Sequence, residues 1–203
     1  RRLAAVGAPG ERLGMLVPSS VPALVAFFAA HVAGRVPVLL NYSADAETIE
    51  QACDLARLKT VVTSRRFIEA GGFEDVEARL RRRANVVHLE DLRRDVGRVD
   101  KLLAALRARL PFLTPRRAGP GDPAAILFTS GTTGEPKGVA LSHANILANI
   151  AQLRQHVPFD PNWVFFNAMP MFHSLGLVGG MLLPVLSGMT TVLHPSPLDK
   201  RRI

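Results

Sequence analysis

The chain has 203 residues and a mass of 22.0 kDa, with 48% hydrophobic and 21% charged residues. This composition excludes a disordered tail and a collagen-like repeat, and the single cysteine, Cys53, excludes a disulfide scaffold. Aromatic residues make up only 6% of the chain, and no zinc-finger spacing or RNA-binding motif accompanies its basic residues, which argues against nucleic acid as a partner. The formal net charge of +8 lies in residues 57–117 and is densest at Arg79–Arg83, which indicates a solvated helix face or a docking surface for an acidic protein or an anionic membrane.

Short apolar runs alternate with helical periodicity over the first 63 residues. Ser19-Ser20 and Pro22 are typical of a helix start, and Gly34 is typical of its end. Strands separated by helices predict an α/β fold, in which a mainly parallel sheet is flanked by helices. The expected strands are Arg12–Val17, Val36–Leu40 and Lys59–Thr63, and the expected helices are Ala23–Ala33 and Ala46–Arg57, the second with Cys53 on its apolar face as a core residue.

The middle of the chain is more polar. It predicts amphipathic helices at Phe73–Arg83 and Val99–Leu110, with a strand at Val86–Leu89 between them. In the second helix, Leu102, Leu103, Leu106 and Leu110 form a stripe opposite Arg107 and Arg109. Residues 111–123 are rich in proline and glycine and predict a linker. The expected organisation is therefore a first α/β subdomain at 1–110, the linker at 111–123, and a second α/β region at 124–203.

The region after the linker again alternates strand and helix patterns. Residues 175–193 carry no charge, but glycines and Pro184 interrupt them, so we expect a buried helix, a turn and a strand instead of a membrane span. The expected strands are Ala125–Thr129, Gly138–Leu141, Trp163–Ala168 and Thr190–Leu193, and the expected helices are Ala144–Gln155, capped by Ser142, and Leu175–Leu186.

The ten residues Thr129–Gly138 (TSGTTGEPKG) combine three hydroxyl side chains after Thr129, three glycines and Lys137. Glycines allow backbone N–H groups to turn toward an anion, hydroxyls add donors, and a lysine supplies a mobile positive charge. This combination predicts a cradle for a polyphosphate. It is not the common P-loop, because Pro136 precedes Lys137 and a strand-like run follows. The alternative is an ordinary hairpin turn rich in glycine and threonine.

This loop resembles the phosphate-binding loop of the adenylate-forming superfamily, and GERLGMLVPSS, GVALSHANI and MPMFHSLG agree with that resemblance. The runs LARLKTVVTSRRFIE and NAMPMFHSLGLVGGMLLPVLSG are similar to the bacterial acyl-acyl carrier protein synthetase domain that occurs fused to a lysophospholipid acyltransferase. The resemblance implies an ATP-dependent ligase that forms an acyl-adenylate from a fatty acid and then transfers the acyl group to acyl carrier protein, with coenzyme A as the alternative acceptor.

The resemblance also implies site residues. Lys137 and His173 would be catalytic, and Phe172, His173 and Gly176 would lie at the substrate. The alternative for His173 is a loop or capping histidine, and helix packing explains Gly176 equally well. The residues implied to bind the phosphates of ATP are Thr129, Ser130, Gly131, Thr132, Thr133, Gly134, Lys137 and Gly138.

Three segments of the family pattern are absent from this chain: a Tyr-Gly-x-Thr-Glu segment with the glutamate that holds Mg²⁺, a Thr-Gly-Asp segment that holds the ribose, and a C-terminal domain with a lysine. The chain is therefore expected to be the front part of an enzyme, inactive alone, with the Mg²⁺ ligand outside it. A non-catalytic module that binds a nucleotide or another anion is the alternative function. A cytoplasmic location is expected, and association with the inner membrane stays open.

Overall fold

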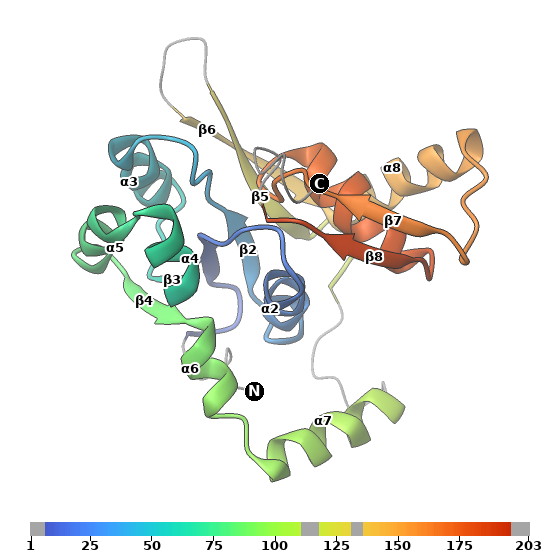
Figure 1. The fold of residues 1–203 in the computed structure, drawn as a ribbon, viewed down its shortest axis with the longest axis horizontal. Coiled ribbons are helices and arrows are strands. Elements are labelled where there is room, and N and C mark those ends of the chain that lie inside the picture. The colour runs from blue at the N-terminus through green and yellow to red at the C-terminus, as the bar shows by residue number, and fades with distance from the viewer. Residues whose placement is uncertain (1–6, 111–117, 131–135, 196–203) are drawn as a thin grey trace.

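A central sheet of six strands organises the computed structural model, which describes residues 7–110, 118–130 and 136–195. The strand order is β4-β3-β1-β2-β5-β6, and a separate pair is formed by β7 and β8 (Figure 1). All pairings are parallel except that of β6 with β5. The prediction of a mainly parallel α/β fold is therefore confirmed. The strands are β1 Arg12–Met15, β2 Val36–Leu39, β3 Thr60–Thr63, β4 Asn85–His88, β5 Pro123–Ser130, β6 Pro136–Ser142, β7 Val164–Asn167 and β8 Thr190–Leu193.

Helices cover both faces of the sheet. Side chains that alternate along β1, β2 and β5 feed two apolar clusters, one against α2, α8 and η2 and the other against α3, α4 and α5 (Figure 1). We call the first of these the η2 face and the second the α3 face. The helices are α2 Val21–Val32, α3 Ala46–Leu55, α4 Arg65–Gly71, α5 Glu74–Arg81, α6 Leu89–Arg94, α7 Arg98–Arg109, α8 His143–His156, the π-helix η2 Leu175–Leu182, and α9 Leu183–Leu186.

Side-chain caps fix where the helices begin. Ser20 accepts a hydrogen bond from the Ala23 N–H, and Ser142 forms a reciprocal capping box with Asn145. The helix expected at Leu175–Leu186 is divided into η2 and α9. Two helices were not predicted, α4 and α6, although α4 is capped by Ser64 and ends at Gly72 with φ +66°. Both are too short to show a helical period.

The end of α3 has an unusual residue. The Leu58 N–H donates to the Cys53 carbonyl and the Arg57 N–H donates to the Asp54 carbonyl, which is the Schellman pattern. That pattern requires a left-handed conformation at its turn residue, and Arg57 adopts it with φ +50°. Glycine normally occupies this position because a side chain is strained there.

The expected division at 111–123 separates segments that share the central sheet. β5 follows the expected linker and pairs in parallel with β2, with Val38 opposite Ile126. β6 then extends the same sheet. Two α/β regions at 1–110 and 124–203 stay a prediction, and residues 111–117 of the linker lie outside the described residues. In the described part of the chain, no helix combines the length and apolarity that crossing a bilayer would require.

Candidate functional site

The expected phosphate cradle lies at the tip of the β5–β6 hairpin. The two strands pair in antiparallel register with Phe128 opposite Gly138, Thr129 opposite Lys137, and Ser130 opposite Pro136. Gly131, Thr132, Thr133 and Gly134 connect them and lie outside the described residues, as does the Ser130 side chain. The register nevertheless places Thr129 and Lys137 as a directly facing pair at the base of this connection.

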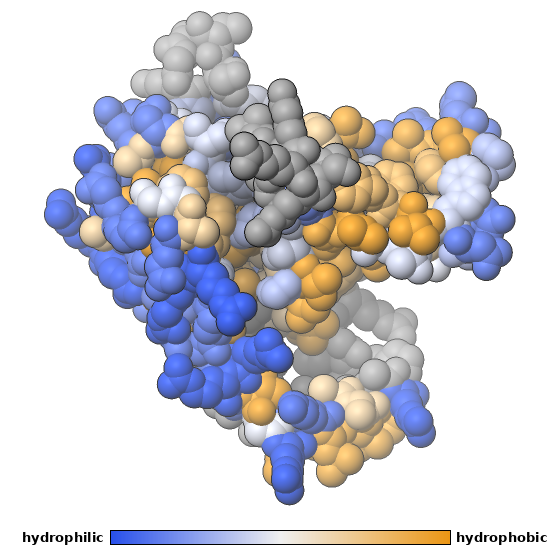
Figure 2. Space-filling view, in the orientation of Figure 1, coloured by the Kyte–Doolittle hydropathy of each residue, from blue (hydrophilic) through white to orange (hydrophobic). Residues whose placement is uncertain are grey.

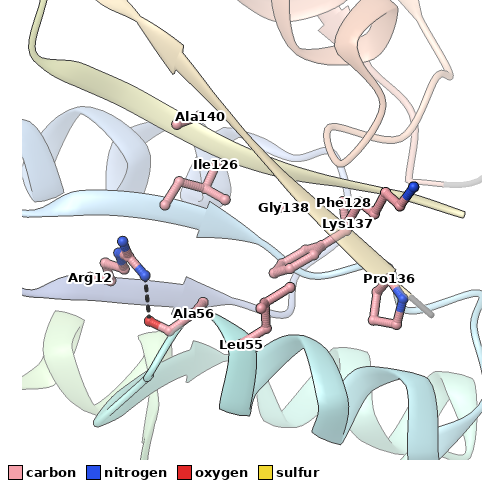
Figure 3. Close-up of a pocket in the computed structure, with 9 residues that line it drawn as sticks. All are labelled: Arg12, Leu55, Ala56, Ile126, Phe128, Pro136, Lys137, Gly138 and Ala140. Carbon is pink, nitrogen blue, oxygen red and sulfur yellow. Dashed lines mark hydrogen bonds between the residues drawn. The ribbon is translucent and has the colours of Figure 1, made fainter. Parts of the chain in front are cut away.

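Side-chain alternation assigns this pair to one face of the sheet. Ile126 and Phe128 pack in the cluster of the α3 face, whereas Leu127 packs in the cluster of the η2 face. Thr129 and Lys137 alternate with Phe128 and Gly138, so they belong to the η2 face. Lys137 is exposed, and Figure 3 shows its amine extending from the side of the hairpin opposite to the Phe128 ring.

The second part of the site is the turn between β7 and η2, residues 168–174. The Asn167 Oδ1 accepts the Met169 N–H at 2.9 Å, and the Pro170 carbonyl accepts the His173 N–H at 3.1 Å. The turn anchors Phe172 in the core at 4% exposure and leaves His173 exposed, with the two rings 4.5 Å apart between centroids. The structure therefore brings Phe172 and His173 together, with the imidazole accessible to solvent.

Gly176 lies where the backbone of this turn crosses η2. A Cβ atom on Gly176 would lie 2.1 Å from the Pro170 carbonyl oxygen, and a Cβ on Gly180 would lie 2.4 Å from the Asn167 amide. A distance of 2.1 Å to a backbone atom allows no side chain. Close packing of η2 against the turn thus accounts for both glycines, and a role of Gly176 at the substrate stays a prediction.

Two side chains tie the turn to the carboxyl ends of the parallel strands. The Ser19 hydroxyl, after β1, donates to the Met169 carbonyl at 2.9 Å. The Tyr42 ring, after β2, meets Phe172 edge-to-face with centroids 4.8 Å apart. The hairpin tip follows β5, which is parallel to β2, so it lies at the same edge of the sheet. In open parallel sheets this edge is where ligands bind.

Tyr42 is a site residue that the sequence analysis missed. Its ring also contacts Phe67 and Phe73 at centroid distances of 5.1 and 6.3 Å, and its hydroxyl donates to the Pro195 carbonyl at 3.4 Å. Burial raises the pKa of Tyr42, so the hydroxyl remains protonated at neutral pH. The signal in the sequence was the single tyrosine, two residues after the expected strand Val36–Leu40.

Three of the four arginines in the Arg79–Arg83 stretch form ion pairs with carboxylates. Arg79 pairs with Asp75 at 2.9 Å and with Glu50 at 3.7 Å, Arg81 pairs with Glu77, and Arg83 pairs with Glu50 at 3.2 Å and with Asp54. These exposed pairs contribute little to stability, but they offset the charge of the patch. Docking of an acidic partner at Arg79–Arg83 has correspondingly weak support.

Among the described residues there is no metal centre, and an open pocket reaches the base of the hairpin that carries the expected cradle. Groups of three or more histidine, cysteine, aspartate or glutamate side chains placed to hold a metal do not occur among them. A pocket of about 470 Å³ opens on the α3 face, where Arg12 donates to the Ala56 carbonyl at 3.2 Å (Figure 3). Its lining is Arg12, Leu55, Ala56, Ile126, Phe128, Pro136, Lys137, Gly138 and Ala140.

Comparisons with known proteins show the family of this chain. The sequence profile of the family described as AMP-binding enzyme matches residues 2–203. The chain is 41% identical over 71 residues to the medium-chain-fatty-acid–[acyl-carrier-protein] ligase TtuA of Teredinibacter turnerae, covering 35% of this chain and 11% of TtuA. It is 29% identical over 215 residues to the mitochondrial medium-chain acyl-CoA ligase ACSF2 of Bos taurus, covering 91% of this chain and 34% of that protein.

A solved structure extends the similarity to the fold. The ATP-bound MatB of Rhodopseudomonas palustris superposes with a TM-score of 0.73 at 26% identity, covering 96% of this chain and 38% of MatB. The chain thus spans at most about a third of the length of these two curated relatives.

Proposed function

Because the chain belongs to the family of AMP-binding enzymes, we propose that it is the N-terminal part of an ATP-dependent ligase that activates a fatty acid as an acyl-adenylate. The observation that carries the proposal is the convergence of two elements at one sheet edge. The hairpin that presents Thr129 and Lys137 and the turn that presents His173 both lie at the carboxyl ends of the parallel strands, on the η2 face. The names of TtuA and ACSF2 support a fatty acid as the substrate.

In the first half-reaction, an oxygen of the fatty-acid carboxylate attacks the α-phosphorus of ATP. The bond from that phosphorus to the bridging oxygen breaks, and pyrophosphate leaves with its electron pair. We propose that the β- and γ-phosphates are bound by Lys137 and by the hydroxyls and backbone N–H groups of the connection. Their contribution is to position the triphosphate and to neutralise the charge that develops on the leaving pyrophosphate.

We propose that the turn binds the fatty-acid substrate. His173 is exposed beside the buried Phe172 ring, so its imidazole can reach a ligand while Phe172 holds its position. We assign to His173 a hydrogen bond to the carboxylate or to the acyl-adenylate carbonyl, and to Phe172 a wall of the acyl pocket. Gly176 keeps the helix close to the turn.

In the second half-reaction, a thiol attacks the acyl carbonyl and AMP leaves. The proposed acceptor is the phosphopantetheine thiol of an acyl carrier protein, with the thiol of coenzyme A as the alternative. The carrier-protein ligase TtuA favours the first, and the acyl-CoA ligase ACSF2 favours the second. The finer proposal, a synthetase domain fused to a lysophospholipid acyltransferase, rests on the sequence resemblance alone.

The described residues contain no group of three or more metal-ligating side chains. The resemblance assigns the Mg²⁺ ligand to the glutamate of a Tyr-Gly-x-Thr-Glu segment, and that segment does not occur in this sequence. We therefore expect the 203 residues alone to form no adenylate. ATP–pyrophosphate exchange by the isolated chain would contradict this expectation.

The test of the proposal is the partial reaction of the intact protein. Lys137→Ala is expected to slow fatty-acid-dependent ATP–pyrophosphate exchange by about 100-fold, the usual effect of losing one group that stabilises the transition state, and to slow transfer from preformed acyl-adenylate much less. Lys59→Ala is the matched control, because Lys59 is exposed at the opposite edge of the sheet, paired with Glu11. Equal loss in both half-reactions would make Lys137 structural, and nucleotide binding without exchange would favour the non-catalytic module.

A further inference from the structure

Helix α7 carries an apolar face that the described part of the chain leaves uncovered. Val99, Leu102, Leu103 and Leu106 are 66%, 71%, 37% and 50% exposed. Neither apolar cluster includes a residue of α7, and no other described helix or strand packs along it. The helix lies at the periphery of the molecule, connected to the sheet through α6 (Figure 1). Exposure of four large apolar side chains on one helix favours an interaction surface over chance.

The four side chains form one continuous stripe. At about 100° per residue, positions 99, 102, 103 and 106 fall within an arc of roughly 100°. Arg98 and Arg109 fall next to one border of that arc, and Lys101 lies beyond them. Figure 2 shows the resulting surface, hydrophobic over α7 and bordered by hydrophilic side chains.

We propose that α7 docks on an anionic lipid bilayer, with its apolar face among the acyl chains and its basic side chains at the level of the lipid phosphates. The described side chains of α7 include three exposed cations, Arg98, Lys101 and Arg109, against the carboxylate of Asp100. This excess positive charge is complementary to phosphatidylglycerol and similar lipids. Arginine at the border of an apolar stripe can lay its methylene groups on the hydrocarbon while its guanidinium stays at the phosphates.

The dimensions favour a helix that lies in the membrane surface. Twelve residues give a helix about 18 Å long, too short for the ~30 Å hydrocarbon core. An apolar arc with basic side chains along its border is instead the pattern of interfacial helices. The docking does not depend on the catalytic assignment.

The test is flotation of the intact protein with vesicles of phosphatidylcholine, with and without phosphatidylglycerol. The double variant Leu102→Ser/Leu106→Ser is expected to reduce partitioning into the anionic vesicles by about tenfold or more. Leu55→Ser/Leu147→Ser is the matched control, since these leucines are 54% and 56% exposed outside α7. Arg98→Gln/Lys101→Gln is expected to weaken binding only where phosphatidylglycerol is present, relative to Arg82→Gln/Arg154→Gln.

A fluorescence measurement separates lipid from protein contacts. In a Trp163→Phe background, the Leu102→Trp indole is expected to emit at shorter wavelength on adding anionic vesicles and to be quenched by brominated lipid. Vesicle binding that is equal in all variants would overturn the proposal. So would an indole that is shielded from a soluble quencher before vesicles are added, because another part of the protein or a second copy would then cover the face.

Discussion

Replacement of Gly176 by alanine tests how the candidate site is held together. The new Cβ would lie 2.1 Å from the Pro170 carbonyl oxygen, 2.8 Å from the Pro170 carbonyl carbon and 3.0 Å from the Met169 carbonyl oxygen. All three are backbone atoms, so no side-chain rotation relieves the clash, and either η2 or the turn must move. Overpacking a core costs about 1–3 kcal/mol, and contact with fixed backbone belongs at the upper end of that range. Alanine recovers up to about 1 kcal/mol of helix propensity.

Gly179→Ala is the control within the same helix. Its Cβ would meet only the Leu175 Cδ1 atom, at 3.2 Å, and that side-chain end can rotate away. Gly179→Ala is therefore expected to be neutral or slightly stabilising, and the two variants should differ by about 2–3 kcal/mol in the free energy of unfolding. That difference is a large part of the ~5–15 kcal/mol by which a domain is stable.

The assay compares both variants in the intact protein, by the midpoint of thermal unfolding and by ATP–pyrophosphate exchange. A shift of the turn moves Phe172 and His173, so Gly176→Ala is expected to lose exchange activity even at temperatures where it stays folded. Gly179→Ala should retain both properties. If Gly176→Ala melts and reacts like Gly179→Ala, then the close approach of η2 to the turn does not govern the site.

Three further predictions concern single residues away from the site. Arg57→Gly is expected to stabilise the fold by about 0.5–1 kcal/mol, measured by thermal unfolding, because glycine relieves the left-handed strain at φ +50°; a lower midpoint would contradict this. Cys53, with burial raising its pKa to about 12, should react with a thiol reagent only after unfolding. Burial, and then His143, lower the pKa of His31 from 6.5 to about 4, so its stabilising effect is complete above pH 6.5 and is lost as the pH falls toward 4. The pKa shift corresponds to at most about 3 kcal/mol in the free energy of unfolding, and partial exposure of His31 reduces this to about 1–2 kcal/mol. Between pH 7 and 5, the His31→Gln variant should therefore lose less stability than the parent protein.

The alternation of strands and helices was predictable because capping and helix-ending residues mark the boundaries of the helices. Ser20, Pro22, Gly34 and Ser142 act within a few residues of their own positions, so the sequence alone locates the ends of α2 and the start of α8. Helices α4 and α6 escaped this reasoning, because seven and six residues contain too little periodicity to read.

Contacts between distant segments were not predictable in the same way. The apolar period of Val99–Leu110 correctly predicted an amphipathic helix, but a period cannot say what covers its apolar face, and in the described part of the chain nothing does. Tyr42 was missed for a related reason. Its contact with Phe172 joins residues 130 positions apart in the sequence, and no local pattern encodes such a pairing.

The two halves of the candidate site are held by different forces, and this separates their expected behaviour under mutation. Thr129 and Lys137 sit on an antiparallel backbone ladder, which depends little on side-chain identity. The turn with His173 depends on side chains: the Ser19 hydroxyl, the Tyr42 ring and the absence of a Cβ at Gly176. Substitutions in the hairpin should therefore change ligand binding with little change in stability. Substitutions that support the turn should change stability and activity together, which gives the two halves distinguishable signatures in one set of measurements.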